Sequence, residues 1–250
     1  MQVVVDGILT NYVRQGNGRV VVILHGWGDS SKSWQQLASA LSHNYDVVVP
    51  DLPGFGATKS PPKTWGLDDY ASFIKDFLKK LNISATYCIV GHSNGGAIAL
   101  RGIAKNIITT DRLILLASAG IRGEYKGRLK ALRYAAKTGK LLTSPLPKAT
   151  KNKLRAKVYQ TIGSDMLVAE HLQETFKKVV SDDVRDDAKK IDIPTLLIYG
   201  ELDQQTPLRY GETLHQLIDH SSLEVLPGAS HFLQLDRPDA INSAIQGFLR

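Results

Sequence analysis

The sequence predicts an α/β protein built on a mostly parallel β-sheet with helices on both faces. Short runs of consecutive apolar residues, bounded by turn-forming residues, are typical of strands that are buried on both sides. Segments with helical spacing of apolar residues alternate with these runs, which favours parallel strands connected by helices. In the middle of the chain basic helical segments replace this alternation, and we interpret them as an insertion.

The strands and helices of the core follow from this pattern in chain order. Predicted strands are residues 8–13, 20–24, 45–49, 87–90, 113–117, 194–200 and 223–226. Predicted helices of the core are residues 33–41, 68–81, 97–104, 210–218 and 238–249. Ser33 is placed to cap the first of these helices.

The insertion covers residues 121–190 and divides the core domain into residues 1–120 and 191–250. Within it, residues 121–158 (the basic segment) contain 12 of the 31 basic residues of the chain and one of its 24 acidic residues. The excess of basic residues therefore lies in this segment, because the rest of the chain has a balance of −4. The predicted helices of the insertion, which Gly and Pro separate, are residues 125–142, 150–162 and 165–180.

No segment of the sequence predicts secretion or membrane insertion. Residues 1–7 have no basic region, and their apolar run is too short for a signal peptide. No run approaches the roughly 18 apolar residues of a transmembrane helix. The one cysteine, Cys88, lies in a predicted strand, and we interpret it as a buried structural thiol. We therefore expect a cytoplasmic protein with no stable membrane insertion.

A serine flanked by glycines, in the sequence VGHSNGG at residues 90–96, lies between a predicted strand and a predicted helix. The pattern G-x-S-x-G in this context is a nucleophile elbow. Gly91 and Gly95 are needed because side chains there would collide with the neighbouring strand and helix. The helix N-terminus beyond the serine favours negative charge. We predict that Ser93 is a catalytic nucleophile.

A serine hydroxyl needs a general base, and the base needs an acid that orients it. His231 follows the last predicted strand, at the carboxyl edge of the sheet where the elbow also lies. Asp203 follows the preceding strand at the same edge. The chain order Ser93, Asp203, His231 matches the order Ser…Asp…His, and we predict these residues as a catalytic triad. Alternative candidates for the acid are Glu201, Asp219 and Asp236.

Two backbone N–H groups are predicted to stabilise the oxyanion of such a reaction. One belongs to Asn94, the residue after the nucleophile, and the other to Trp27 in the loop HGWG. Gly26 and Gly28 allow this loop to approach a substrate. His25 in the same loop is interpreted as structural. Aromatic candidates for lining the acyl pocket are Trp34, Trp65 and Phe232.

Five segments of the chain resemble, in order and spacing, signatures of the α/β-hydrolase fold superfamily. They are HGWG at 25–28, DLPGFG at 51–56, GHSNGG at 91–96, GELD at 200–203 and GASHF at 228–232. The resemblance extends over essentially the whole chain, with residues 121–190 in the place of the variable helical cap. It implies an eight-stranded, mostly parallel sheet and a triad of Ser93, His231 and Asp203. It does not fix the substrate, because this fold hosts many chemistries.

The resemblance leaves three functions open. The serine at position 93 separates the chain from the haloalkane dehalogenases and epoxide hydrolases, which place aspartate there. The primary expectation is hydrolysis of a carboxylic ester through an acyl-enzyme. The second is hydrolysis of a carbon–carbon bond in dienoic ring-fission products, by a group that usually carries Trp after the catalytic His, where this chain has Phe232. The third is a non-catalytic ligand receptor on the same fold, which loss of a triad member would favour.

The expected partner is a small-molecule ester, and the basic segment bears on its charge. Lysine stems commonly cover apolar surface and leave a solvated charged face. The alternative is that the charge attracts an anionic substrate or an anionic membrane surface. Nucleic-acid binding is not expected, because the charge is local and no binding motif accompanies it. No metal or organic cofactor is expected either, and the sequence leaves the oligomeric state open.

Overall fold

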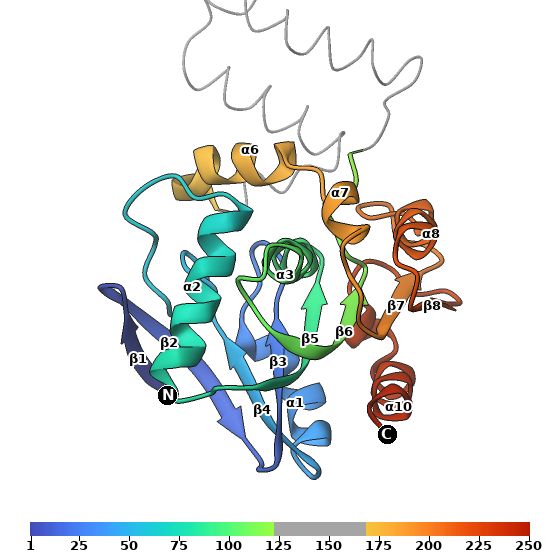
Figure 1. Ribbon diagram of the computed structural model, residues 1–250, viewed down its shortest axis with the longest axis horizontal. Coiled ribbons are helices and arrows are strands. Elements are labelled where there is room, and N and C mark those ends of the chain that lie inside the picture. Colours follow the sequence, from blue (N-terminus) through green and yellow to red (C-terminus); the bar gives the residue numbers. More distant parts are fainter. Residues whose placement is uncertain (123–168) are drawn as a thin grey trace, which may run out of the picture.

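The computed structural model describes residues 1–122 and 169–250. The predicted helices at 125–142 and 150–162 lie outside the described residues, as does nearly all of the basic segment. The division into a core and an inserted cap therefore stays a prediction. Residues 169–190, the described end of the predicted insertion, lie above the tips of the parallel strands, at the carboxyl edge of the sheet (Figure 1).

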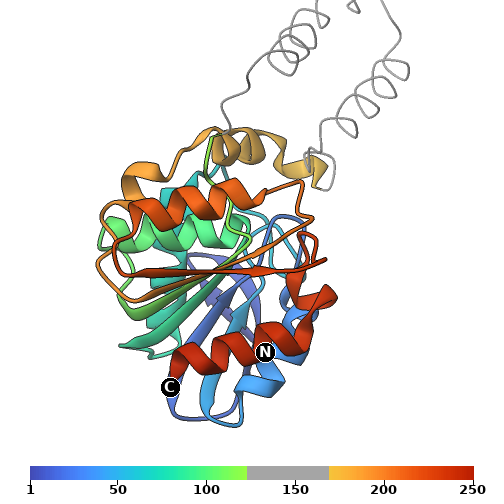
Figure 2. The same cartoon turned by 90° about the vertical axis from the view of Figure 1, so that its right-hand side faces the viewer.

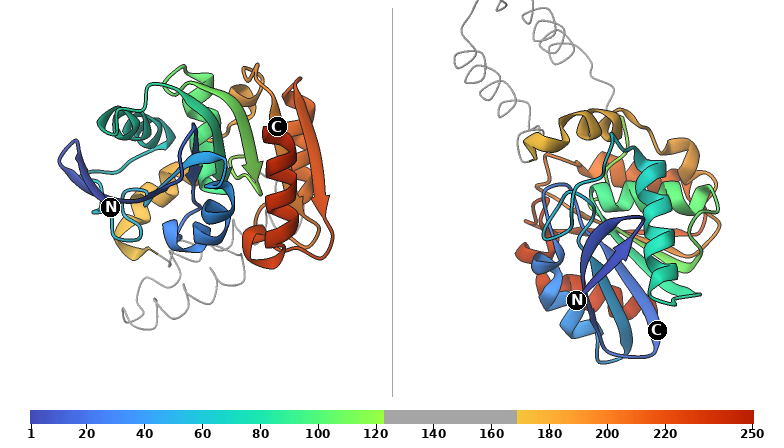
Figure 3. Two further views of the ribbon diagram at one scale, coloured as in Figure 1. Left: turned by 90° about the horizontal axis from the view of Figure 1, so that it is seen from below. Right: turned by 90° about the vertical axis from the view of Figure 1, so that its left-hand side faces the viewer.

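An eight-stranded sheet forms the centre of the described fold. Its strands are β1 (Gln2–Val5), β2 (Ile8–Gln15), β3 (Arg19–Leu24), β4 (Tyr45–Pro50), β5 (Thr86–His92), β6 (Thr110–Leu116), β7 (Thr195–Gly200) and β8 (Ser221–Leu226). Their order across the sheet is β1-β2-β4-β3-β5-β6-β7-β8, so that β1 and β8 form opposite edges (Figure 3). β2 pairs antiparallel with β1 and β4, whereas all the other pairs are parallel. The predicted mostly parallel, eight-stranded sheet is confirmed.

Helices cover both faces of this sheet, as predicted (Figure 2). The longer core helices are α1 (Gln35–Leu41), α2 (Leu67–Lys80), α3 (Asn94–Ala104), α8 (Leu208–Leu217) and α10 (Pro238–Leu249). One face packs against α1 and α10, and the other against α2, α3 and α8. The remaining described elements are η1 (Ser31–Trp34), η3 (Glu170–Leu172), α6 (Gln173–Ser181), α7 (Arg185–Ala188) and α9 (Leu233–Asp236).

The central strands are apolar on both faces, which explains why they appear in the sequence as unbroken apolar runs. In β3, Val22 and Leu24 join the core cluster that includes α2 and α3. Val21 and Ile23 join the cluster that includes α1 and α10. Successive strand residues point to opposite faces. A strand covered by helices on both sides therefore needs apolar residues at every position.

An ionic cluster ties the segment that contains α6 and α7 to the helices α2 and α3. Arg101 in α3 contacts Asp187 in α7 at 2.7 Å and Asp68 in α2 at 3.0 Å. Asp182, directly after α6, lies 3.9 Å from the same guanidinium. Burial by itself lowers the pKa of Arg101, but the hydrogen bonds to Asp187 and Asp68 outweigh it and raise that pKa above its ordinary value. The helix α3, which follows the predicted nucleophile, is thus linked by charge to α2, to α7 and to the end of α6.

Three local expectations differ from the structure. Residues 2–5 form β1, which was not predicted because its apolar run is very short. Ser33 does not cap α1, because it lies inside η1 and its Oγ donates to the Asp29 carboxylate instead. The same carboxylate accepts the indole N–H of Trp34 at 2.9 Å, which fixes this turn. The helix predicted at 165–180 begins only with α6 in the described residues, after the turn η3.

Candidate active site

Ser93 forms the turn between β5 and α3. Its backbone has φ 51° and ψ −117°, a region that costs of order 1–3 kcal/mol for a residue with a side chain. A Cβ on Gly91 would lie 2.6 Å from the Cα of Gly96. A Cβ on Gly95 would overlap the carbonyl group of Leu24. The strained serine turn expected from the sequence is present, and both glycines lie at close backbone contacts.

The loop after β6 holds the main chain of this turn. The amide of Ser93 donates to the carbonyl of Leu116 at 3.0 Å, and the amide of Ala119 donates to the carbonyl of Ser93 at 2.9 Å. Ala117, which lies between Leu116 and Ala119, has a φ of 45°, so it too adopts a positive φ. Ser93 is therefore fixed both by its own turn and by the loop of the neighbouring strand.

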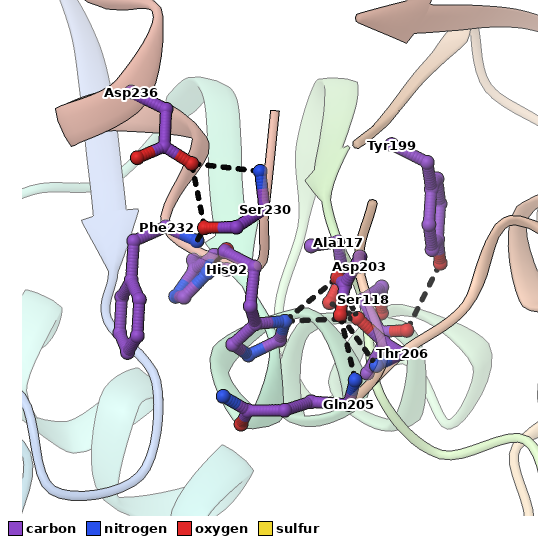
Figure 4. A network of polar contacts seen from close by, with 11 residues as sticks. His92, Ala117, Ser118, Tyr199, Asp203, Gln205, Thr206, Ser230, Phe232 and Asp236 are labelled. Carbon is purple, nitrogen blue, oxygen red and sulfur yellow. Dashed lines mark hydrogen bonds and ion pairs between the residues drawn. The ribbon is translucent and has the colours of Figure 1, made fainter. Parts of the chain in front are cut away.

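His231 and Asp203 form a buried pair at the same edge of the sheet. The two residues are joined at 2.8 Å, from His231 Nδ1 to Asp203 Oδ2. The other carboxylate oxygen accepts the amides of Gln205 and Thr206 at 2.8 and 2.9 Å (Figure 4). Burial by itself raises the pKa of Asp203, but the hydrogen bonds from His231 and Thr206 outweigh it and lower that pKa. The carboxylate is therefore ionised at neutral pH and orients the imidazole.

His92 connects this pair to the serine turn. Its Nε2 donates to the main-chain carbonyl of His231 at 2.9 Å, and the two imidazole rings lie 4.9 Å apart between centroids. The residue next to Ser93 thus contacts the predicted base directly. Within the described residues no hydrogen bond joins Ser93 Oγ to His231, as is common before a substrate is bound.

The loop at residues 25–28 lies against the serine turn. A Cβ on Gly26 would lie 3.2 Å from the Cβ of Ser93. In the described part of the chain, the amides of Trp27 and Asn94 have no hydrogen-bond acceptor. Free N–H groups beside the nucleophile are what an oxyanion requires. The roles of Trp27 and Asn94 stay predictions that this arrangement supports.

His25 is held on both sides of its ring. Its Nδ1 donates to the carbonyl of Gly26 at 2.7 Å, while its Nε2 accepts the amide of Leu52 at 2.9 Å. The side chain is fully buried, and burial lowers its pKa. These contacts agree with the structural role expected from the sequence.

The three aromatic residues predicted for the acyl pocket have different positions. Trp34 has no exposed surface and packs on His92, so the structure places it in the core. Trp65 is also buried among core side chains and acts as a packing residue. Phe232 is 43% exposed, and its ring lies 5.5 Å from that of His231. An aromatic residue in a sequence does not reveal which way its ring turns, so a buried packing residue and a pocket residue look alike there. Of the three, Phe232 is the one that lies beside the imidazole, and its role in a pocket stays a prediction.

The helix α6 lies over the loop that carries Trp27. The ring of Phe176 lies 5.0 Å from that of Trp27, and Phe55 contacts the same indole at 4.8 Å. Just before α6, Leu172 occupies the space above Gly54, where a Cβ would overlap it. Sequence reasoning missed Phe55 and Phe176 as neighbours of Trp27, because no pattern in the sequence relates these positions.

The alternative acids have partners of their own. Glu201 is exposed and accepts a backbone amide of the neighbouring loop at 2.9 Å. Asp236 accepts the amide and the hydroxyl of Ser230 at 2.7 and 2.6 Å (Figure 4). Asp219 is exposed beyond the end of α8. Of these carboxylates in the described part of the chain, Asp203 is the one in contact with His231.

The described residues contain neither a metal-binding cluster nor a membrane-spanning helix. Within residues 1–122 and 169–250, no group of three or more His, Cys, Asp or Glu side chains is arranged to hold a metal ion. No helix of these residues combines the length and the apolar character needed to cross a bilayer. Cys88 is buried in β5, and burial raises the pKa of its thiol, in agreement with a structural role.

His92 makes the stability of the fold sensitive to acid. Burial lowers its pKa to about 4, and the neighbouring His231 adds to the shift. Because this pKa lies below the unfolded value of about 6.5, the contribution is complete above pH 6.5 and is lost as the pH falls towards 4. Between pH 7 and pH 4 the unfolding free energy of the wild type falls. We expect this fall to be smaller by about 3 kcal/mol in His92→Asn, which lacks the titrating imidazole.

Urea denaturation of wild type and variant at pH 7, 5.5 and 4 measures this effect. His43→Gln, at an exposed histidine, is the matched control and should leave the pH dependence as in wild type. Parallel pH profiles for the wild type and His92→Asn would contradict the prediction.

The fold and the arrangement at its carboxyl edge define an α/β hydrolase. Comparison with known families agrees, since the model of the alpha/beta hydrolase family matches residues 21–244. The chain belongs to this family.

Its relatives include proteins named as hydrolases of dienoic acids and of meta-cleavage products. The chain is 25% identical to the 2-hydroxy-6-oxo-6-(2'-aminophenyl)hexa-2,4-dienoic acid hydrolase of Metapseudomonas resinovorans, over 97% of this chain and 88% of the relative. It is 26% identical to the 2-hydroxy-6-oxo-2,4-heptadienoate hydrolase of Pseudomonas putida F1, over 99% and 95% of the two chains. The solved meta-cleavage product hydrolase of Pseudomonas fluorescens IP01 superposes with a TM-score of 0.75 at 25% identity, covering 99% of this chain and 96% of the other.

Proposed function

We propose that this hydrolase cleaves a carboxylic ester of a small molecule through an acyl-enzyme. The observation that carries the proposal is the buried His231–Asp203 pair, which lies beside a strained turn that presents Ser93. An ionised carboxylate on one ring nitrogen makes the other nitrogen a base for a nearby hydroxyl. Neither a metal nor an organic cofactor takes part in this chemistry.

In the proposed mechanism, Ser93 Oγ attacks the carbonyl carbon of the ester while Nε2 of His231 takes its proton. The amides of Trp27 and Asn94 stabilise the negative charge that develops on the carbonyl oxygen. His231 then gives the proton to the leaving alcohol, and the acyl group stays on Ser93. Water, activated by the same imidazole, releases the acid, and Asp203 stabilises the charged imidazole in both steps.

A second candidate function is hydrolysis of a carbon–carbon bond in a dienoic ring-fission product. The relatives from Metapseudomonas resinovorans and Pseudomonas putida, both named as hydrolases of such compounds, favour it. Phe232, in the position where that group usually carries Trp, is the residue of this chain that departs from it.

The two candidates are separated by their substrates. We expect p-nitrophenyl esters of increasing acyl length to give turnover that peaks at one length, because an esterase binds the acyl chain that fills its acyl pocket best. In parallel, a 2-hydroxy-6-oxo-hexa-2,4-dienoate is followed by the loss of its absorbance. Turnover of the dienoate without turnover of any ester would replace the first candidate by the second. A folded protein that hydrolyses neither would contradict both.

A further inference from the structure

Thr206, three residues after Asp203, makes three polar contacts inside the site. Its Oγ1 lies 2.7 Å from Asp203 Oδ2, 2.9 Å from the carbonyl oxygen of Ala117 and 3.1 Å from Nδ1 of His231. The residue is 5% exposed. Figure 4 shows Thr206, Asp203 and Ala117 gathered in one group joined by dashed lines. One hydroxyl therefore contacts the acid, the base and the neighbouring loop.

The number of protons on these atoms decides their roles. A hydroxyl has one proton to donate and two lone pairs that accept. The carbonyl of Ala117 and the ionised carboxylate of Asp203 only accept, so the proton of Thr206 is directed to one of them or shared. In each case a lone pair of Oγ1 faces Nδ1 of His231. A lone pair on Nδ1 would be repelled there, whereas an N–H is attracted.

We propose that Thr206 is a positioning residue that keeps the hydrogen of His231 on Nδ1. The hydrogen bond at one ring nitrogen determines the state of the other, so Nε2 is left without a proton and ready to accept one from Ser93. Asp203 favours the same tautomer, and Thr206 both reinforces it and holds the carboxylate in place. This inference rests on the proposed function, because it assigns a task within the same triad.

The contact with Ala117 gives the hydroxyl a second task. Ala117 lies between the two residues whose main-chain groups hold Ser93, namely Leu116 and Ala119. The hydroxyl of Thr206 therefore joins the loop that carries the acid to the loop that holds the nucleophile. This connection sets the position of His231 relative to Ser93, on which the proton transfer depends.

The test compares Thr206→Val, which keeps the shape and removes the hydroxyl, with Thr206→Ser, which keeps the hydroxyl. We expect Thr206→Val to lower kcat roughly 10-fold with KM changed less than about twofold, since misplacement by a fraction of an ångström acts on the chemical step. Thr206→Ser should retain at least about a third of kcat. The ¹⁵N and ¹H resonances of the His231 imidazole, recorded without substrate, should move in Thr206→Val and stay near wild type in Thr206→Ser.

Thermal melts establish that each variant is folded, and Thr206→Ala replaces the valine variant if that one does not fold. An unchanged kcat together with unchanged imidazole resonances in Thr206→Val would overturn the inference. Equal losses in Thr206→Val and Thr206→Ser would also overturn it, because they would indicate a packing role. Since the resonances need no substrate, they test Thr206 independently, whereas failure of the proposed function appears as hydrolysis that persists in Ser93→Ala.

Discussion

Ser93→Ala is expected to lower kcat for the preferred ester by about 10⁴- to 10⁶-fold. The variant loses the oxygen that forms the acyl-enzyme, and the oxyanion donors alone give little turnover. The unfolding free energy should stay within about 1 kcal/mol of wild type, because alanine and serine carry a similar penalty at a φ of 51°. Steady-state hydrolysis and urea denaturation measure the two quantities.

The matched control for this variant is Ser42→Ala. Ser42 lies at the surface, and its Oγ donates to the carbonyl of Ser39 at 2.8 Å. This control should leave kcat within about twofold of wild type. Hydrolysis by Ser93→Ala above a hundredth of the wild-type rate would remove Ser93 from the role of nucleophile.

Asp203→Asn is expected to lower kcat by about 10³- to 10⁴-fold with KM little changed. An asparagine amide in this place donates a hydrogen bond to Nδ1 of His231, and the imidazole then carries its hydrogen on Nε2, where it cannot accept the proton of Ser93. The fold should persist, because the backbone amides of Gln205 and Thr206 can still donate to the remaining side-chain oxygen. A titration of kcat for the preferred ester across neutral pH measures the effect.

Glu201→Gln is the control, since Glu201 is the alternative acid closest in sequence to Asp203. Its carboxylate is exposed and contacts the loop before His231 rather than the imidazole. We expect its kcat to stay within about threefold of wild type. A larger loss in Glu201→Gln than in Asp203→Asn would exchange the roles of the two carboxylates.

Much of the fold is predictable because its strands are buried on both faces. Val21 and Ile23 face one cluster and Val22 and Leu24 the other, so the whole segment is apolar and visible in the sequence. The positions of Asp203 and His231 follow from the same logic. In a parallel sheet the residues after successive strands meet at one edge, and Asp203 and His231 are in contact there.

Other features depend on side-chain directions that the sequence does not encode. The ring of Trp34 turns into the core because the Asp29 carboxylate accepts its indole N–H, and no local pattern predicts this choice. Thr206 can be read from the sequence as a residue of the loop after Asp203. Its proposed positioning role follows only from the three distances between its hydroxyl and Ala117, Asp203 and His231. The contact of Phe176 with Trp27 joins segments that are far apart in the chain.

The topology of the sheet also affects how the protein acquires activity as it folds. The hydrogen bonds around Ser93 connect β5 and β6. Asp203 follows β7, which pairs with β6, and His231 follows β8, which pairs with β7. Parallel pairs between segments distant in the chain are among the slower contacts to form. During refolding, helical circular dichroism should therefore recover before hydrolysis does. On the proposed mechanism, activity is expected to report late in folding, because it needs residues that follow β7 and β8, and both strands must first join the sheet.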